Sequence, residues 1–355
     1  MSKLQLENIS HSYDSGKRWA VKNVNLLFES GKQYALLGPS GCGKTTLLKI
    51  ITGLIRPTIG KVLINDSDVT NFPPEKRNVS IVFQFPVVYR MSVLENLMFP
   101  LMNVKMSKEE KKEKAVEVAA LLGIENILHE SATKLGPADR QKVAIGRALI
   151  KNSDIILLDE PMSSIEPEKK YEIKKLLLNV GRRGKKTMIF VTHDQTEALT
   201  FGEKIAIMSP DGELLQFGTF DEVYHKPANE FVGFFIGFPG MNIIKAQYEP
   251  PRLIIGSLTI RNEKIRLPSD GPAEIRIGIR PEHVKIYDSH FEGAFPFKVV
   301  YLENLGRNKF ILHLKHDDVL IKALSESEFA AGSTVWVYLP PEFLNVFDEK
   351  GWRIT

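Results

Sequence analysis

The sequence has a single cysteine, Cys42, so no disulfide can form within the chain. So little cysteine favours a reducing compartment such as the cytoplasm. No apolar run approaches the roughly 20 residues that a membrane-spanning helix needs. The opening stretch, MSKLQLENIS, also lacks the apolar core of a signal peptide. These absences predict a cytoplasmic protein that is neither secreted nor embedded in a membrane.

A strong excess of one charge is also missing. The formal net charge is +4, from 47 basic and 43 acidic residues, and it is too small and too dispersed to indicate nucleic-acid binding. A content of 25% charged and 43% hydrophobic residues is typical of soluble globular proteins. At 355 residues, the chain is long enough for two domains, each with its own core.

The clearest motif present is a glycine-rich segment, GPSGCGKTT, which satisfies the pattern G-x-x-x-x-G-K-[ST]. It follows an apolar run suited to a buried strand, residues 34–37, and precedes a helix-forming segment, residues 46–51. Backbone N–H groups and a helix N-terminus placed in this way attract phosphate. Lys44 would reach the β- and γ-phosphates, and the Thr45 hydroxyl would bind Mg²⁺. The alternative is a plain strand-to-helix turn with an exposed lysine, which the two flanking segments disfavour. The predicted nucleotide-binding residues here are Gly38, Pro39, Ser40, Gly41, Cys42, Gly43, Lys44, Thr45 and Thr46.

A second motif, IILLDEP, places two acidic residues directly after four apolar ones. The pattern predicts a buried parallel strand whose carboxyl end reaches a site. Asp159 would hold Mg²⁺, and Glu160 would polarise the attacking water. Taken alone, a strand that ends in Asp-Glu is more often the solvated start of a loop. The phosphate loop upstream favours the functional interpretation.

Two further candidates are weaker on their own. His193 follows the apolar run of residues 188–191, and Gln84 follows the run IVF. A histidine after a strand is more often a structural hydrogen-bonding group, and the glutamine could simply cap a strand end. Their position in the order of motifs supports a functional role for both.

This order of motifs resembles that of the nucleotide-binding subunits of ATP-binding cassette (ABC) transporters, most closely the ATPases of maltose-type and glycerol-phosphate-type sugar importers. Three longer stretches extend the resemblance over nearly the whole chain: DVTNFPPEKRNVSIVFQ, GELLQFGTFDEVYHKPANEFVGFFIGFPGMN and IGIRPEHVKI. The resemblance implies an α/β fold, with a P-loop ABC ATPase cassette over residues 1–235 that includes a helical subdomain at about 86–154. It implies a C-terminal β-barrel domain of the OB/TOBE type over residues 236–355.

The resemblance also implies roles for single residues. The ligands would be ATP and Mg²⁺, with Thr45, Gln84 and Asp159 around the metal and with Glu160, His193 and Gln84 as catalytic residues. An aromatic residue at the end of the first strand, here Tyr13 in LQLENISHSY, stacks on adenine in this family. A tyrosine in a strand usually contributes to packing, so the stacking role is supported only because Tyr13 stands at the position where the family has its aromatic residue.

The secondary structure expected along the chain agrees with these domain divisions. Residues 86–154 look mostly helical, and the charged run 108–114 indicates a solvated helix face. Residues 155–235 alternate between strands and helices, as in a parallel sheet covered by helices. From about residue 240 the pattern changes to short strands with turns, exemplified by RLIIGSLTIRNEKIRL, AEIRIGIR and KFILHL. OB-type barrels can bind oligosaccharides or nucleic acid, but no aromatic platform is evident between residues 252 and 314, which favours a dimerising or regulatory role.

An unusually apolar segment, FPVVYRMSVLENLMFPLM, follows Gln84. In the family, this region meets a short cytoplasmic helix of the permease, although burial in the chain's own core would explain the residues about as well. The run between Gln84 and Met91 is one residue shorter than usual, with Arg90 in place of the usual Pro-His. The shape of any permease socket therefore differs from the family pattern.

The strongest departure from the family lies where the signature LSGGQ is expected. The chain has LGPAD there, comprising Leu135, Gly136, Pro137, Ala138 and Asp139. In the family, two ATPases sandwich two ATPs, and the signature of one subunit contacts the γ-phosphate held by the other. The changes remove a hydroxyl and an N–H donor, add a Cβ and introduce an anion. Loss of one preorganised donor typically lowers a rate by about 10²–10³-fold, and two like charges about 4 Å apart repel by about 4 kcal/mol at an effective dielectric of 20. Alternatively, Asp139 simply favours the start of a helix.

The loop after Glu160 also differs, because it reads SSIEP where the family has a serine, two variable residues and an aspartate. Glu166 keeps the negative charge on a side chain that is one methylene longer.

A homodimer of this chain would have two degraded signatures and should hydrolyse ATP poorly, although its catalytic set is complete. The sequence therefore predicts a heterodimer in which a second ABC ATPase supplies a competent signature. The predicted partners also include two permease subunits and, indirectly, an extracytoplasmic solute-binding protein, with the chain peripheral at the cytoplasmic face of the cell (inner) membrane. The transported solute would be a sugar or polyol derivative, of the glycerol, glycerol-3-phosphate or oligosaccharide type. The alternatives are a homodimeric importer ATPase and a regulatory ABC module that hydrolyses ATP poorly; a soluble ABC protein of DNA repair or translation is disfavoured because there is one cassette only.

Overall fold

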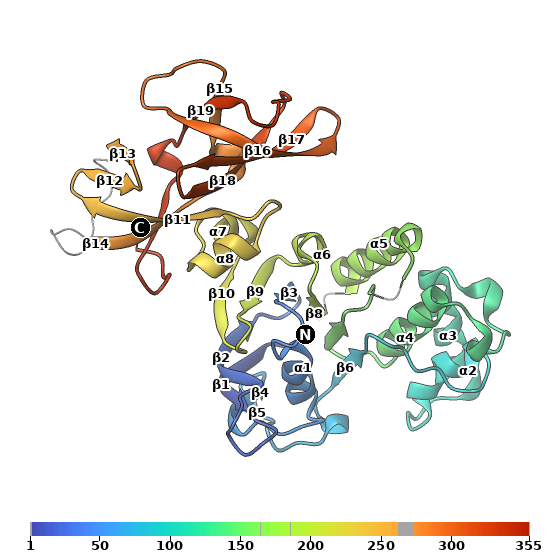
Figure 1. Ribbon diagram of the computed structural model, residues 1–355. Helices are drawn as coiled ribbons and strands as arrows, with labels where there is room; N and C mark the ends of the chain where they lie inside the picture. Colours follow the sequence, from blue (N-terminus) through green and yellow to red (C-terminus); the bar gives the residue numbers. More distant parts are fainter. Residues whose placement is uncertain (1, 164, 185, 262–272, 355) are drawn as a thin grey trace. The chain divides into compact units, whose positions relative to one another are not determined.

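A six-stranded sheet forms the centre of the N-terminal part of the chain (Figure 1). The computed structural model describes residues 2–163, 165–184, 186–261 and 273–354. The sheet order is β10-β9-β3-β8-β7-β6, and all neighbouring pairs are parallel except β10 with β9. Its strands are β3 (Gln33–Leu37), β6 (Val79–Val82), β7 (Ile155–Asp159), β8 (Thr187–Thr192), β9 (Lys204–Met208) and β10 (Leu214–Gly218). Every residue of β7 and β8 is buried, which explains why both strands read as continuous apolar runs.

A smaller antiparallel sheet, in the order β2-β1-β4-β5, packs into the same core. It contains β1 (Leu4–His11), β2 (Val21–Phe28), β4 (Ile59–Ile64) and β5 (Ser67–Asp68). Buried side chains of helix α1 (Lys44–Thr52) share one apolar cluster with residues of both sheets. The helix that follows the glycine-rich loop is therefore fixed on several sides.

The prediction that Tyr13 ends the first strand is wrong, because β1 stops at His11. The Ser12 hydroxyl donates to Asp14 Oδ1 at 2.7 Å and accepts from the N–H of Gly16 at 2.8 Å. Such local side-chain bonds compete with strand pairing and turn the chain out of the sheet. Tyr13 therefore lies in a turn.

Three helices make up most of the segment predicted to be helical: α2 (Val93–Met98), α3 (Lys108–Leu122) and α4 (Pro137–Ile150). Both α2 and α3 begin with a capping box, formed by Ser92 with Glu95 and by Ser107 with Glu110. Gly146 of α4 allows close helix packing, because a Cβ there would lie 2.5 Å from a methyl group of Leu97. The N-terminal part of the chain also contains α5 (Pro167–Gly184) and α6 (Gln195–Phe201).

The C-terminal part is built mainly from two five-stranded antiparallel sheets, in the orders β13-β12-β11-β14-β20 and β15-β19-β16-β17-β18. The strands are β11 (Asn242–Glu249), β12 (Arg252–Ile255), β13 (Leu258–Arg261), β14 (Ala273–Ile279), β15 (Lys285–Tyr287), β16 (Phe295–Gly306), β17 (Lys309–His316), β18 (Val319–Ser325), β19 (Thr334–Tyr338) and β20 (Asn345–Phe347). Buried apolar residues of both sheets form a single core cluster. The α/β fold with a C-terminal β-domain of the OB type is confirmed; residues 262–272, within and after the predicted strand segment RLIIGSLTIRNEKIRL, lie outside the described part.

Compactness divides the chain into two units, Met1–Phe220 and Asp221–Thr355. Helices α7 (Phe220–His225) and α8 (Glu230–Phe235) come at this division. The boundary that we predict between the functional domains, after residue 235, is a separate statement and stays a prediction.

The arginine in the segment IGIRPEHVKI, Arg280, is buried and has a structural role. Arg280 is 2% exposed, and its guanidinium donates to the carbonyl oxygens of Tyr224 at 2.7 Å, Gly233 at 2.9 Å and Ile236. Its Cζ also lies 3.9 Å from the centroid of the Tyr224 ring, over the face of that ring. The arginine of this motif thus fastens α7 and α8 to the strands of the second unit.

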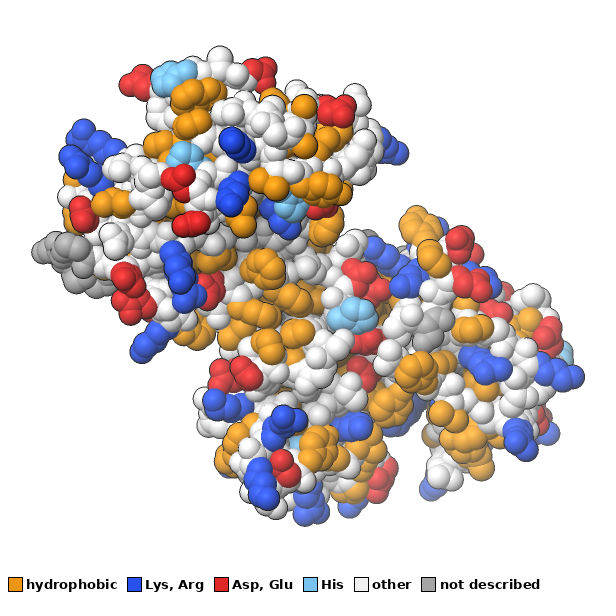
Figure 2. Space-filling view, viewed as in Figure 1, with side chains coloured by type: hydrophobic (Ala, Val, Ile, Leu, Met, Phe, Trp, Pro, Cys, Tyr) orange, Lys and Arg blue, Asp and Glu red, His pale blue; other side chains and the backbone are white. Residues whose placement is uncertain are grey.

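The face of the molecule seen in Figure 2 shows Lys and Arg side chains intermixed with Asp and Glu, in keeping with the low net charge. Within the described residues, no helix combines the length and apolarity that crossing a membrane requires.

Candidate nucleotide and catalytic site

The glycine-rich loop lies between β3 and α1, as predicted. Gly41 and Gly43 have φ angles of 83° and 93°, in the region that favours glycine. At Gly43 a Cβ would lie 2.0 Å from the carbonyl oxygen of Ala20, so no other residue fits there. The loop can therefore bring its backbone N–H groups close to a bound group.

Lys44 folds back over this loop. Its Nζ donates to the carbonyl oxygens of Gly38 at 2.8 Å and Pro39 at 2.9 Å and lies 3.8 Å from Cys42 Sγ. Among the described contacts of Lys44 there is no ion pair, so its charge remains available to an anion. This arrangement fits a nucleoside triphosphate.

Two of the three residues predicted around the metal, Thr45 and Asp159, are in contact, whereas the described contact of Gln84 is from its Nε2 to Glu160. Thr45 Oγ1 donates to Asp159 Oδ1 at 3.3 Å, and the Asp159 side chain is buried. The described residues contain no cluster of three or more His, Cys, Asp or Glu side chains that could hold a metal by themselves. Mg²⁺ commonly binds one or two protein oxygens together with substrate phosphates and water, so this donor set fits Mg²⁺.

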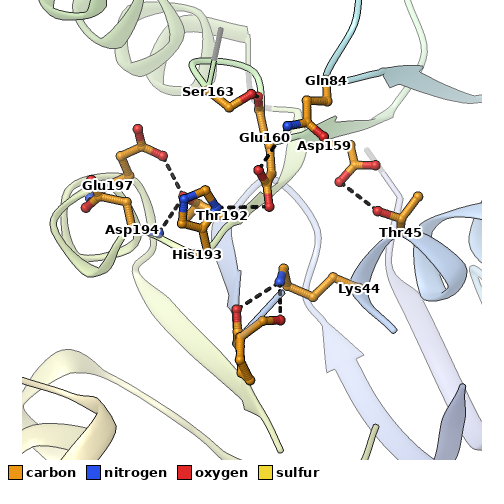
Figure 3. A network of polar contacts seen from close by, with 12 residues as sticks. Lys44, Thr45, Gln84, Asp159, Glu160, Ser163, Thr192, His193, Asp194 and Glu197 are labelled. Carbon is orange, nitrogen blue, oxygen red and sulfur yellow. Dashed lines mark hydrogen bonds and ion pairs between the residues drawn. The ribbon is translucent and has the colours of Figure 1, made fainter. Parts of the chain in front are cut away.

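Glu160 stands at the centre of the candidate catalytic residues, as Figure 3 shows. Its carboxylate accepts from Gln84 Nε2 at 3.4 Å and lies 3.1 Å from His193 Nδ1. The Glu160 side chain is 15% exposed, whereas that of His193 is 54% exposed. A largely buried carboxylate among hydrogen-bonding groups can accept a proton from a positioned water.

The backbone of Glu160 is in an unusual conformation, with a φ of 44°. For an L-residue other than glycine, this left-handed region costs about 1–2 kcal/mol. The N–H of Glu160 donates to Val191 O at 2.9 Å, and its carbonyl accepts from the Ser163 hydroxyl at 3.0 Å. These bonds hold the strained residue so that its side chain leaves the end of β7 towards Gln84 and His193.

Burial raises the pKa of the Asp159 carboxyl above its usual range, and the charge of Glu160 acts in the same direction. A carboxyl with a folded-state pKa above its unfolded value loses stability as pH rises through the folded pKa. We therefore expect Asp159→Asn to raise the Tm of the nucleotide-free chain at neutral pH and to weaken Mg²⁺-dependent nucleotide binding. Calorimetry at a series of pH values should show this gain shrinking as the solution becomes acidic.

Asp154 provides a matched control of opposite sign. The Ser2 hydroxyl donates to Asp154 Oδ2 at 2.7 Å and lowers the pKa of that carboxyl. Because its ionised form is stabilised by folding, Asp154→Asn should lower the Tm at neutral pH. Equal shifts in the two variants would contradict this electrostatic account.

The turn after β1 contributes to a cavity of about 680 Å³ beside the phosphate loop, within the size range of ligand pockets. Its lining includes Tyr13, Lys17, Arg18, Trp19 and Gly41. Tyr13 is 63% exposed, and its hydroxyl lies 3.1 Å from Thr46 Oγ1. Stacking on adenine stays a prediction. Lys17, Arg18 and Trp19 were not predicted as site residues, and the only signal for them in the sequence is the basic pair Lys17-Arg18 before β2.

The segment LGPAD forms the start of α4. Gly136 is the N-cap residue, with φ and ψ of −68° and 168°, and no side chain caps the helix. Pro137 occupies the first helical position, where its missing N–H leaves no bond unmade, and Asp139 lies in the first turn. The departures from the family signature are therefore compatible with a regular helix. Within the described part of the chain, no hydrogen bond or ion pair joins this segment to the cluster around Glu160.

The loop after Glu160 is described except for Ser164. Glu166 is exposed, and its carboxylate lies 3.3 Å from Lys169 Nζ. Its carbonyl accepts from the N–H groups of Lys169 and Lys170 and so begins α5. The predicted role of Glu166 in contacts with another subunit stays a prediction.

The apolar segment after Gln84 divides into two parts. Val93 and Leu97 are buried in the core of the helical region, as the packing alternative predicted. Phe85 and Val87, in contrast, are 71% and 70% exposed. Arg147 donates to the carbonyl oxygen of Val87 at 2.8 Å, which fixes this exposed loop to α4.

Comparisons with known proteins agree with this site. The family model for ABC transporters matches residues 21–163. The chain is 36% identical over 360 residues to the sn-glycerol-3-phosphate import ATP-binding protein UgpC of Yersinia pestis bv. Antiqua, covering all of this chain and 99% of that protein. It is also 36% identical to the protein of the same name from Escherichia coli O157:H7, with full coverage of both chains.

Solved structures resemble about three fifths of the chain. A dimeric bacterial ABC transporter cassette is 32% identical, with a TM-score of 0.56, and the match covers 61% of this chain and 98% of that one. A post-hydrolysis state of an ATP-binding cassette, bound to ADP and phosphate, gives the same identity, coverage and TM-score. Together with the full-length relatives, these matches show that the chain belongs to the ABC transporter family, as an ATP-binding, ATP-hydrolysing protein of the importer type.

Proposed function

We propose that this chain hydrolyses ATP to drive uptake of glycerol-3-phosphate or a related sugar or polyol derivative, in a heterodimer with a second ABC ATPase. The proposal of a heterodimer rests on a difference between the catalytic residues of this chain and its signature segment. The groups around Glu160 are gathered and within hydrogen-bond reach, whereas α4 begins with LGPAD. The solute class rests on the relatives, which are named as import proteins for sn-glycerol-3-phosphate.

In the proposed site, the phosphate loop and Lys44 bind the phosphates of ATP, while Thr45, Asp159 and Gln84 hold Mg²⁺. The metal would neutralise charge on the phosphates. Glu160 orients and polarises the attacking water, and His193 lies beside it at 3.1 Å. Tyr13 stacks on the base from the rim of the neighbouring cavity.

The proposed asymmetry follows from the chemistry of the first turn of α4. An LSGGQ segment would offer a hydroxyl and flexible glycine N–H groups to the partner's nucleotide. Here Gly136 has no hydroxyl, Pro137 has no N–H, and Asp139 adds a negative charge. The competent site would combine this chain's phosphate loop with the partner's signature, and the other site would hydrolyse ATP slowly.

The loop 85–89 is the proposed contact with the permease. The exposed Phe85 and Val87 side chains leave the chain directly after Gln84, which reaches Glu160 at 3.4 Å. A change at the nucleotide could therefore move this loop against two permease subunits at the cytoplasmic face of the membrane. An extracytoplasmic solute-binding protein would deliver the solute to the permease. The proposed domain division is 1–235 for the cassette and 236–355 for the regulatory β-domain.

The steady-state ATPase rate of the purified chain, alone and mixed with candidate partner ATPases, tests the heterodimer. We expect little turnover from the chain alone and a clear gain on adding the right partner. Strong turnover from the chain alone would instead support the homodimeric importer ATPase. Nucleotide binding without turnover in any mixture would favour the regulatory module.

A further inference from the structure

The backbone on either side of His193 is held by a closed set of hydrogen bonds. Thr192, the last residue of β8, is 1% exposed, and its hydroxyl accepts from the N–H of Asp194 at 2.9 Å. The same hydroxyl donates to Glu197 Oε2 at 2.6 Å. The Asp194 carboxylate in turn accepts from the N–H of Glu197 at 3.1 Å. Thr192, Asp194 and Glu197 therefore hold the backbone on both sides of His193, and none of their described hydrogen bonds involves its ring.

The His193 imidazole is the only side chain of the four that extends to Glu160 in the described contacts (Figure 3). It is more than half exposed, whereas its backbone lies between a buried strand end and the first turn of α6. This combination suits a side chain that must change partners while its Cα stays in place.

Glu197 contributes to this set in two ways, through its backbone N–H and through its carboxylate. Burial raises the pKa of its carboxyl, and the bond from the Thr192 hydroxyl acts in the opposite direction. Glu197 is partly buried, and removing a carboxylate from water is unfavourable unless hydrogen bonds such as the one from Thr192 compensate for it. A small cavity of about 80 Å³ is lined by Glu160, Lys170, His193 and Glu197, among others, so Glu197 lies beside the catalytic groups and a lysine of α5.

We propose that Glu197 is a positioning residue for ATP hydrolysis, which acts through the Thr192 hydroxyl to fix the backbone around His193. It touches neither nucleotide nor the attacking water in this proposal. The inference rests on the proposed catalytic site and deepens it, because it assigns the placement of His193 to the hydrogen bond between the buried Thr192 and the partly buried Glu197.

The test uses substitutions that separate the hydrogen bond from the charge. Thr192→Val keeps the shape but removes the hydroxyl, and Glu197→Leu removes the acceptor. Both should lower kcat by up to about 10²-fold, as expected when a catalytic group is displaced by about 1 Å, with little change in the KM for ATP. Glu197→Gln keeps an acceptor oxygen for the Thr192 hydroxyl and should therefore retain most of the parent kcat.

Thr200→Val is the matched control, because Thr200 lies on the same helix and its hydroxyl bonds only to the carbonyl of Thr196 among the described contacts. This variant should keep the parent rate. An unchanged kcat in Thr192→Val, or a loss in Glu197→Gln as large as in Glu197→Leu, would overturn the positioning role.

A second measurement does not depend on turnover. The side-chain NMR signal of His193 in the purified full chain, assigned with His193→Gln, should shift or broaden in Thr192→Val and stay unchanged in Thr200→Val. An unaltered signal in Thr192→Val would overturn the inference even if no partner ATPase were found. Absence of turnover in the parent chain with every partner would instead count against the proposed function.

Discussion

Glu160→Gln is expected to lower the steady-state ATPase rate of the chain with its partner by about 10²–10⁴-fold, the usual contribution of a general base. The amide has nearly the same shape, so it can keep the contacts to Gln84 at 3.4 Å and His193 at 3.1 Å. It cannot accept a proton from water at neutral pH. Binding of ATP, measured by equilibrium titration, should therefore persist while the rate of hydrolysis falls.

Glu168→Gln serves as the control, because Glu168 is an exposed acid in the first turn of α5. It should leave both binding and turnover unchanged. If Glu160→Gln kept a rate near that of the parent, Glu160 would not be the base, and the roles assigned to its neighbours would have to be revised.

Restoring the signature is expected to raise the ATPase rate of the chain alone by about 10²-fold or more, since each recovered donor is typically worth about 10²–10³-fold. The variant combines Gly136→Ser, Pro137→Gly, Ala138→Gly and Asp139→Gln. A serine fits at position 136, because a Cβ there would meet no atom within 4 Å. Its backbone already has the extended conformation of an N-cap residue. With two competent signatures, a homodimer would hydrolyse ATP at both sites.

The same variant should be less stable. Ala138→Gly replaces a buried helical residue and costs about 1 kcal/mol, and Pro137→Gly frees a backbone that proline restricts. A lower Tm together with a higher rate would show that LGPAD favours the fold over the contact with a partner's nucleotide. Adding Glu160→Gln to the variant controls for contaminating activity. A rate no higher than that of the unmodified chain would show that the signature does not limit the homodimer.

The sequence predicted those features that depend on local pattern. The strand before the phosphate loop, the helix after it, and the buried strands that end near Asp159 and His193 are all confirmed within one or two residues. The spacing of apolar residues and glycines predicts these elements, because each element buries its apolar residues whatever it packs against. The order of these motifs was sufficient to identify the family.

One error shows where local reasoning stops. The segment LQLENISHSY was predicted to be one strand ending at Tyr13, but the strand ends at His11. The hydroxyl of Ser12 bonds to the Asp14 carboxylate and to the N–H of Gly16, and this local turn takes the place of further strand pairing. A pattern of apolar residues does not report such competition.

Only the tertiary structure decided which groups meet. Thr192 and Glu197 are five residues apart, yet their bond depends on how β8 turns into α6, and Arg280 reaches carbonyl oxygens more than forty residues away. Glu160 meets Gln84 because β6 and β7 pair side by side. The sequence by itself determined the elements and the chemistry they present, since both follow from residue type and spacing. The partners of each polar group depended on how the elements pack, because burial makes each polar group take whichever partner the fold brings within reach.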